Sequence, residues 1–93
     1  MFRKWRNGDI IAILPTLPGT SSPYTCEMYE HVGQHGAGDP QSVIRKTKNA
    51  TRSEYAALLK ELHKIGYRNL VVHTRYQSGW LSTRRKELAR MRG

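Results

Sequence analysis

Two short stretches of the sequence concentrate positively charged side chains, and these are the residues best suited to a chemical role. The first stretch runs from Arg45 to Arg52 and the second from Trp80 to Lys86. Lysine and arginine neutralise phosphates and an indole ring stacks on bases, so both stretches are typical of a nucleic-acid surface. The predicted contact residues are Arg45, Lys46, Lys48, Arg52, Trp80, Arg84, Arg85 and Lys86.

The overall charge fits a nucleic-acid partner but also fits others. Sixteen lysines and arginines against seven acidic residues give the 93-residue chain a net charge of +9, which favours anionic partners. Residues 7–44 contain no lysine or arginine, and their acidic residues are Asp9, Glu27, Glu30 and Asp39. The same charges would serve solubility, a membrane surface or an acidic protein. They would also serve an interaction adaptor whose acidic block meets a basic partner or a second copy.

Two histidines, His31 and His35, suggest other kinds of chemistry. With Cys26 or Asp39 they would supply three ligands to zinc, although a pair four residues apart shares one face only in a helix. His35 is also the candidate for general acid–base catalysis, because an imidazole exchanges its proton near neutral pH. No residue is fixed as its partner. We therefore expect a non-enzymatic binding protein without metal or cofactor. An enzyme that uses His35 ranks third, after nucleic-acid binding and the interaction adaptor.

One helix is well defined by local chemistry, and it would position the first basic stretch. Thr51 and Glu54 have the spacing of a capping box, and Gly66 suits the left-handed stop that lets Tyr67 fold back. Apolar residues at three- and four-residue spacings form one stripe: Tyr55, Leu58, Leu59, Leu62 and Ile65. We predict a helix over residues 52–65 with the first basic stretch at its border.

Three segments have the composition of β-strands. Asp9–Leu14 is an apolar run, Thr25–Val32 alternates between apolar and polar residues, and Asn69–Tyr76 is rich in β-branched and aromatic residues. The predicted fold is α+β. It has a small antiparallel or mixed sheet of about three strands, the main helix packed on one face, and a basic C-terminal helix or tail.

The remaining segments give weaker signals. Residues 33–38 are rich in glycine and are expected to form a flexible loop. Residues 41–47 follow Asp39 and a proline, which favours a short helix, although two β-branched residues would also suit a strand. Within the second strand, Cys26 is expected to face the core and Tyr29 to face solvent.

The chain length is that of a single domain, residues 1–93, with residues 1–8 and 82–93 as flexible basic ends. Cys26 is the only cysteine, so an intramolecular disulfide is excluded and a reducing, cytoplasmic setting is expected. The apolar run Ile10–Leu14 is too short for a membrane span. Nothing in the sequence predicts the oligomeric state.

Residues 29–72 resemble a scattered group of small bacterial and phage or prophage proteins with no established activity. The shared pattern is YxHVGQH followed by ATxxEYAxLLxELxxIGY, seen here in Tyr29–His35 and Ala50–Tyr67. The resemblance implies a phage or prophage context, with a host or phage protein as a further class of partner. It implies no mechanism. Asn49 stands where the pattern expects a proline, which loosens the turn before the helix.

Overall fold

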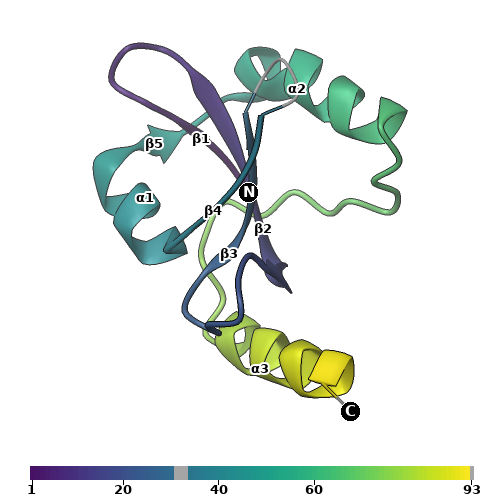
Figure 1. Cartoon of the computed structure of the whole chain (residues 1–93). Coiled ribbons are helices and arrows are strands. Elements are labelled where there is room, and N and C mark those ends of the chain that lie inside the picture. Colours follow the sequence, from purple (N-terminus) through teal and green to yellow (C-terminus); the bar gives the residue numbers. More distant parts are fainter. Residues whose placement is uncertain (31–33, 93) are drawn as a thin grey trace.

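A five-stranded antiparallel sheet is the centre of the computed structural model, which describes residues 1–30 and 34–92. The strand order is β4-β3-β2-β1-β5, so β2 lies in the middle and β4 and β5 form the edges (Figure 1). The predicted α+β class is confirmed, but three strands and one main helix understate the architecture. In chain order the elements are β1 (Phe2–Lys4), β2 (Ile10–Pro18), β3 (Cys26–Glu30), β4 (Gln34–Gly38), α1 (Pro40–Lys46), β5 (Lys48–Asn49), α2 (Arg52–Lys64) and α3 (Gly79–Arg92).

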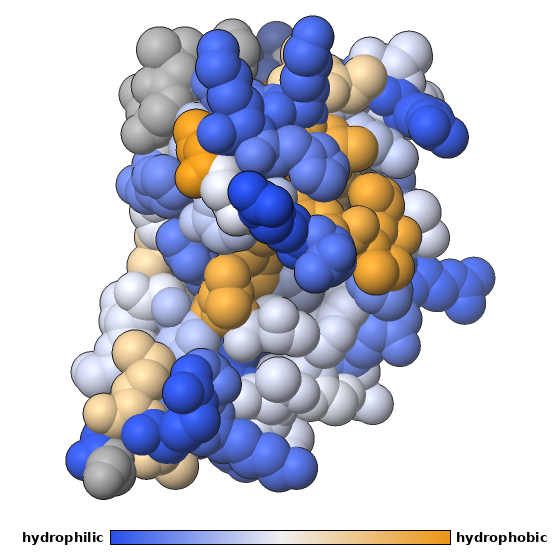
Figure 2. All heavy atoms as spheres, turned by 90° about the vertical axis from the view of Figure 1, so that its right-hand side faces the viewer, coloured by the Kyte–Doolittle hydropathy of each residue, from blue (hydrophilic) through white to orange (hydrophobic). Residues whose placement is uncertain are grey.

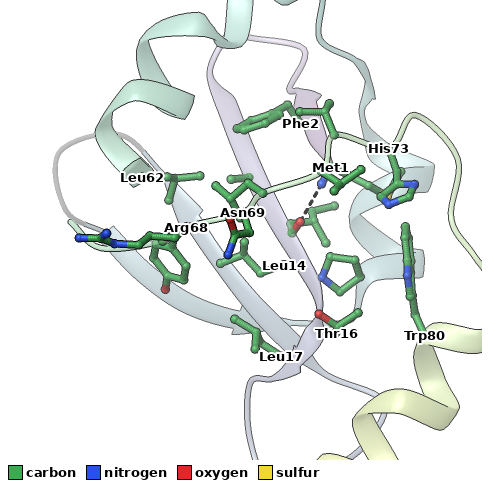
Figure 3. A pocket seen from close by; sticks show the side chains of 17 residues that line it. Met1, Phe2, Leu14, Thr16, Leu17, Leu62, Arg68, Asn69, His73 and Trp80 are labelled. Atoms are coloured by element: carbon green, nitrogen blue, oxygen red, sulfur yellow. Dashed lines mark hydrogen bonds between the residues drawn. The ribbon is translucent and has the colours of Figure 1, made fainter. Parts of the chain in front are cut away.

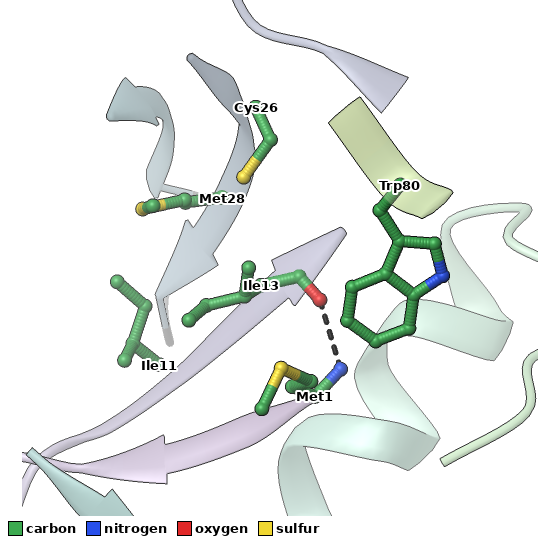
Figure 4. Packing of buried hydrophobic residues seen from close by; sticks show 6 residues of the cluster. All are labelled: Met1, Ile11, Ile13, Cys26, Met28 and Trp80. Atoms are coloured by element: carbon green, nitrogen blue, oxygen red, sulfur yellow. Dashed lines mark hydrogen bonds between the residues drawn. The ribbon is translucent and has the colours of Figure 1, made fainter. Parts of the chain in front are cut away.

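Helices cover both faces of this sheet, because successive strand residues point to opposite sides and both sets are apolar. On the face that we call the α2 face, Phe2, Ala12 and Tyr29 pack with Leu58 and Leu62 of α2. On the opposite, α1–α3 face, the buried cluster consists of Met1, Ile11, Ile13, Cys26, Met28 and Trp80 (Figure 4). The prediction that Tyr29 faces solvent is therefore wrong: its side chain is 1% exposed beneath α2.

The N-terminal residues lie in the sheet, which differs from the flexible end expected of residues 1–8. β1 pairs with β2 on one side and with β5 on the other, and Phe2 lies opposite Ala12. The Phe2 ring stacks on Tyr55 of α2 with 4.4 Å between ring centroids. The amino group of Met1 donates a hydrogen bond to the carbonyl of Ile13 at 2.9 Å. Buried apolar side chains at the first two positions hold this end in place.

The ends of α2 follow the local chemistry, as predicted. Thr51 accepts a hydrogen bond from the Glu54 backbone N–H, and the Glu54 side chain accepts one from the Thr51 N–H, which confirms the capping box. At the other end, the Tyr67 N–H donates to the Leu62 carbonyl, and Gly66 has φ 115°. This Schellman stop turns the chain back, so that the Tyr67 hydroxyl donates to Glu27 on β3 at 2.9 Å.

The segment predicted as a third strand, Asn69–Tyr76, forms no strand. It belongs to the connector between α2 and α3, residues 67–78, which crosses from one face of the sheet to the other. Of the described strands, β2 is already paired on both sides, and the segment runs along neither open edge, β4 or β5, but across a face of the sheet. Leu70 and Val72 instead pack against the α2-face cluster, and Val71 remains 71% exposed.

Two segments around α1 resolve the remaining alternatives. Residues 34–38 form the edge strand β4, where a loop was predicted, because their backbone pairs along β3 from Glu30 to Cys26. Residues 40–46 form α1, as favoured from the sequence, with Asp39 capping the Gln41 N–H and proline at the first position. The second strand ends at Glu30, and Val32 lies outside the described residues.

The C-terminal segment is a helix, α3, over most of the part that was expected to be a flexible end. Trp80, Arg84 and Leu88 are buried against the sheet, whereas Met91 is 68% exposed. No helix in the described part of the chain has the length and apolar character needed to cross a membrane.

Candidate nucleic-acid interface

A hollow lined by basic residues lies between the β1–β2 hairpin and the α1–β5 connection. Its volume is about 490 Å³, and we call it the basic groove. Two segments distant in the sequence meet there, because β5 pairs with β1. The lining residues are Lys4, Trp5, Arg6, Asn7, Gly8, Arg45, Lys46, Thr47 and Lys48.

The hairpin turn fixes one wall of the groove. The Trp5 N–H donates to the Asp9 carbonyl and the Gly8 N–H donates to the Trp5 carbonyl, each at 2.9 Å. Gly8 has φ 97°, a backbone conformation that residues with a Cβ rarely adopt. Asn7 also accepts a hydrogen bond from the Asp9 N–H at 3.0 Å. The tight turn therefore holds Arg6 at the tip and leaves Trp5 at the entrance to the strand.

Buried Arg3 fixes the other wall. Arg3 is only 8% exposed, and its side chain points to the α1–α3 face. Its guanidinium donates to the carbonyls of Ile44 and Thr47, at 3.1 and 2.7 Å, and to the hydroxyl of Thr47 at 2.9 Å. A further hydrogen bond reaches the Asn49 side chain. Arg3 thus holds the chain between α1 and β5 against β1, and the basic residues around Thr47 are carried on that fixed backbone.

The groove presents four cations that have no acidic partner among the described residues. Lys4 differs, because its ammonium pairs with Glu54 of α2. The hydrogen bond from Lys4, together with the Thr51 backbone N–H, lowers the pKa of Glu54 to about 2. The other cations are exposed: Arg6, Arg45, Lys46 and Lys48. Positive charge in this hollow is therefore available to an anionic ligand.

The predicted basic residues divide between two ends of the molecule. Arg45, Lys46 and Lys48 line the groove, while Arg52 lies in the first turn of α2 outside it. Arg85 and Lys86 are exposed on α3, which Figure 1 shows at the opposite end from the hairpin. The two predicted stretches do not form one surface.

Trp80 and Arg84 are not surface contacts, which corrects the prediction for both. Trp80 is 9% exposed, and the rings of His73 and Tyr76 lie against it, with 5.2 and 5.1 Å between ring centroids. Arg84 is 2% exposed and donates to the carbonyls of Pro23 and Pro15 at 2.8 and 2.7 Å. Both side chains fasten α3 to the sheet, so neither is available to a base or a phosphate.

The histidine candidates are not gathered into a catalytic or metal site in the described residues. His31 lies outside them. His35 is exposed on β4, where its ring lies 4.7 Å from the Tyr29 ring on the α2 face. Cys26 points to the α1–α3 face, and burial raises the pKa of its thiol to about 11. His35 and Cys26 are therefore separated by the sheet, and no group of three metal-ligating side chains occurs in the described chain.

A second hollow, of about 350 Å³, lies beneath the 67–78 connector and has mainly apolar walls. Leu14 and Leu17 of β2, Leu62 of α2 and Trp80 of α3 surround it in Figure 3, and the side chain of Arg68 extends away from it. Figure 2 shows the outer face on this side as separate apolar patches between hydrophilic side chains. This hollow suits an apolar group and gives no support to phosphate binding.

Trp5 is a stacking ring that the composition itself suggests, but the sequence alone did not place Trp5 and Arg6 beside Arg45–Lys48, although a signal was present. Asn7-Gly8 is a common hairpin turn, and the residues on either side of it would have been expected to pair. Such a hairpin brings the N-terminal cations into the sheet. It does not reveal that β5, and with it Lys48, would pair along β1.

Comparisons with protein families, with curated proteins and with solved structures return no match for this chain. The resemblance in residues 29–72 therefore stays a prediction, and the phage or prophage context stays one with it.

Proposed function

We propose that this protein binds nucleic acid through the basic groove. The observation that carries the proposal is the meeting of Arg6 with Arg45, Lys46 and Lys48 around Trp5, with no acidic partner among the described residues. Lysine and arginine side chains that have no acidic partner can bind phosphates without first breaking an ion pair. An aromatic ring in the same hollow adds a surface for bases.

A protein-binding adaptor that uses the acidic block is the alternative, and it has less support. Glu27 and Glu30 point to opposite faces of β3, and Glu27 accepts a hydrogen bond from Tyr67. Asp39 caps α1, and Asp9 lies in the hairpin turn. The acidic residues therefore form no single surface that would meet a basic partner.

The test is a binding titration of the full chain with fluorescently labelled DNA and RNA at low salt. The double variant Lys46→Gln/Lys48→Gln removes two groove cations, and we expect its affinity to fall by about tenfold or more. The matched control is Lys60→Gln/Lys64→Gln, which removes the same charge from exposed positions on α2.

Equal affinity losses in the two double variants would contradict the proposal, because net charge alone would then explain binding. Absence of binding to every nucleic acid at low salt would also contradict it. Circular dichroism and urea unfolding of both variants check that the fold is unchanged.

A further inference from the structure

The two tryptophans of the chain differ in how much of the indole ring is accessible to a ligand. Trp80 is 9% exposed and has aromatic rings against it on more than one side. Trp5 is half-buried: it packs against the cluster on the α1–α3 face and also lines the basic groove. One indole ring therefore has both a rigid support and an accessible surface inside a basic hollow.

A hollow of about 490 Å³ has the size of a small-molecule site, which is roughly 300–1,000 Å³. Proteins read duplex DNA with a protruding helix or a two-stranded ribbon placed in the major groove. The β1–β2 ribbon is not free for that purpose, because β5 and β3 pair along its two outer edges. Only its tip projects, and there Arg6 is accompanied by Asp9. The four cations line a hollow, whose shape fits a flexible single strand better than a rigid duplex.

We propose that the basic groove takes an unpaired nucleotide of a single strand, whose base stacks on Trp5. Phosphates on either side of this nucleotide would contact Arg6, Arg45, Lys46 and Lys48. In a duplex each base face is already covered by its neighbours, whereas an unpaired base offers its face to an aromatic side chain. This inference rests on the proposed function and adds to it the class of nucleic acid and the residue that recognises it.

The experiment uses the full chain with three short probes of one sequence: single-stranded DNA, single-stranded RNA and the DNA duplex. We expect both single strands, or one of them, to bind at least about tenfold more tightly than the duplex and to quench tryptophan emission. The DNA and RNA arms decide which sugar is preferred. Trp5→Leu should lose the quenching and about 5- to 150-fold in single-strand affinity, the value of one stacked base.

Trp5→Phe is the matched variant, because it keeps an aromatic face and should keep most of the affinity. Duplex binding as tight as single-strand binding would overturn the inference, as would unchanged single-strand affinity in Trp5→Leu. Either result leaves the proposed function standing if Lys46→Gln/Lys48→Gln still weakens binding. Absence of any binding overturns both. If Trp5→Leu does not fold, the wild-type preference and quenching decide, since Trp80 is buried and does not report on the groove.

Discussion

Two arginines of this chain, Arg3 and Arg84, are buried, and each donates hydrogen bonds to backbone carbonyls that lie far away in the sequence. Arg3 joins the first strand to the end of α1, and Arg84 joins α3 to β2 and to the loop before β3. A guanidinium has five donors in a rigid fork, so it can satisfy several carbonyls at such a junction. Some of the positive charges of the chain therefore serve to hold the fold together. The groove cations differ from them, because they are exposed and have no acidic partner among the described residues.

The ion pair between Lys4 and Glu54 gives a pH-dependent prediction. The pKa of Glu54 is lowered from 4.5 to about 2, first by the hydrogen bond from Lys4. A carboxylate with a depressed pKa in the folded state stabilises the fold above pH 4.5, and this contribution disappears as the pH falls towards 2. Glu54→Gln keeps a side chain suited to a capping box but lacks the charge, so it should be less stable than wild type at neutral pH only.

Urea unfolding at several pH values measures this difference, which should shrink below pH 4.5 and vanish near pH 2. Carboxyl NMR titration provides the direct check. Lys4→Gln should move the pKa of Glu54 back towards its ordinary value. A Glu54 that titrates near 4.5 in the wild-type protein would show that the ion pair does not form in solution.

At the level of elements, the sequence predicted what depends on neighbouring residues. The cap formed by Thr51 and Glu54, the stop at Gly66 and the start of α1 at Asp39 all involve contacts within a few residues. The sequence did not predict the pairing of β1 with β5, because that contact joins residues more than forty positions apart. Half of the groove, Arg45 to Lys48, was therefore predicted, and the wall from Lys4 to Gly8 was not.

The connector shows the converse error. Its local sequence predicts a strand over residues 69–76, but the segment forms none. Leu70, Val71 and Val72 have the composition of a strand, but every strand also needs a partner edge. The segment joins neither open edge of the sheet, β4 or β5, and packs two of these side chains on the α2 face instead. β4 is the opposite case. Its glycines predict a loop, but a glycine has the same backbone N–H and C=O groups as other residues, and these pair with β3.

The stop of α2 gives a prediction that separates backbone conformation from packing. A Cβ at Gly66 or at Gly36 would meet no atom within 4 Å, but only Gly66 has a positive φ, of 115°. Gly66→Ala should therefore lower the free energy of unfolding by about 1–2 kcal/mol through conformation alone. Gly36→Ala, in β4, is the matched control and should leave stability unchanged or slightly raised. Equal losses of stability in the two variants would contradict this prediction, because the positive φ of Gly66 would then not explain its loss.

At the scale of the whole molecule, β2 separates the two basic regions. The hairpin turn and the groove lie at its Ile10 end, while Arg84 fastens α3 near Pro15. Arg85 and Lys86 on α3 are thus carried away from Lys46 and Lys48, although the sequence places both pairs in similar basic stretches. A nucleic acid held in the groove is consequently expected to contact one set of cations and not the other.

Salt dependence tests this separation. If a single strand contacts the four unpaired groove cations, the logarithm of the binding constant should fall with the logarithm of salt concentration with a slope of about −3. Lys46→Gln/Lys48→Gln removes two of the four contacts and should reduce that slope by about half. Arg85→Gln/Lys86→Gln removes equal charge from α3 and should leave it unchanged. A wild-type slope near −6 that falls in the α3 variant would mean that the strand reaches both ends of the molecule, and that the groove is only one part of a longer binding surface.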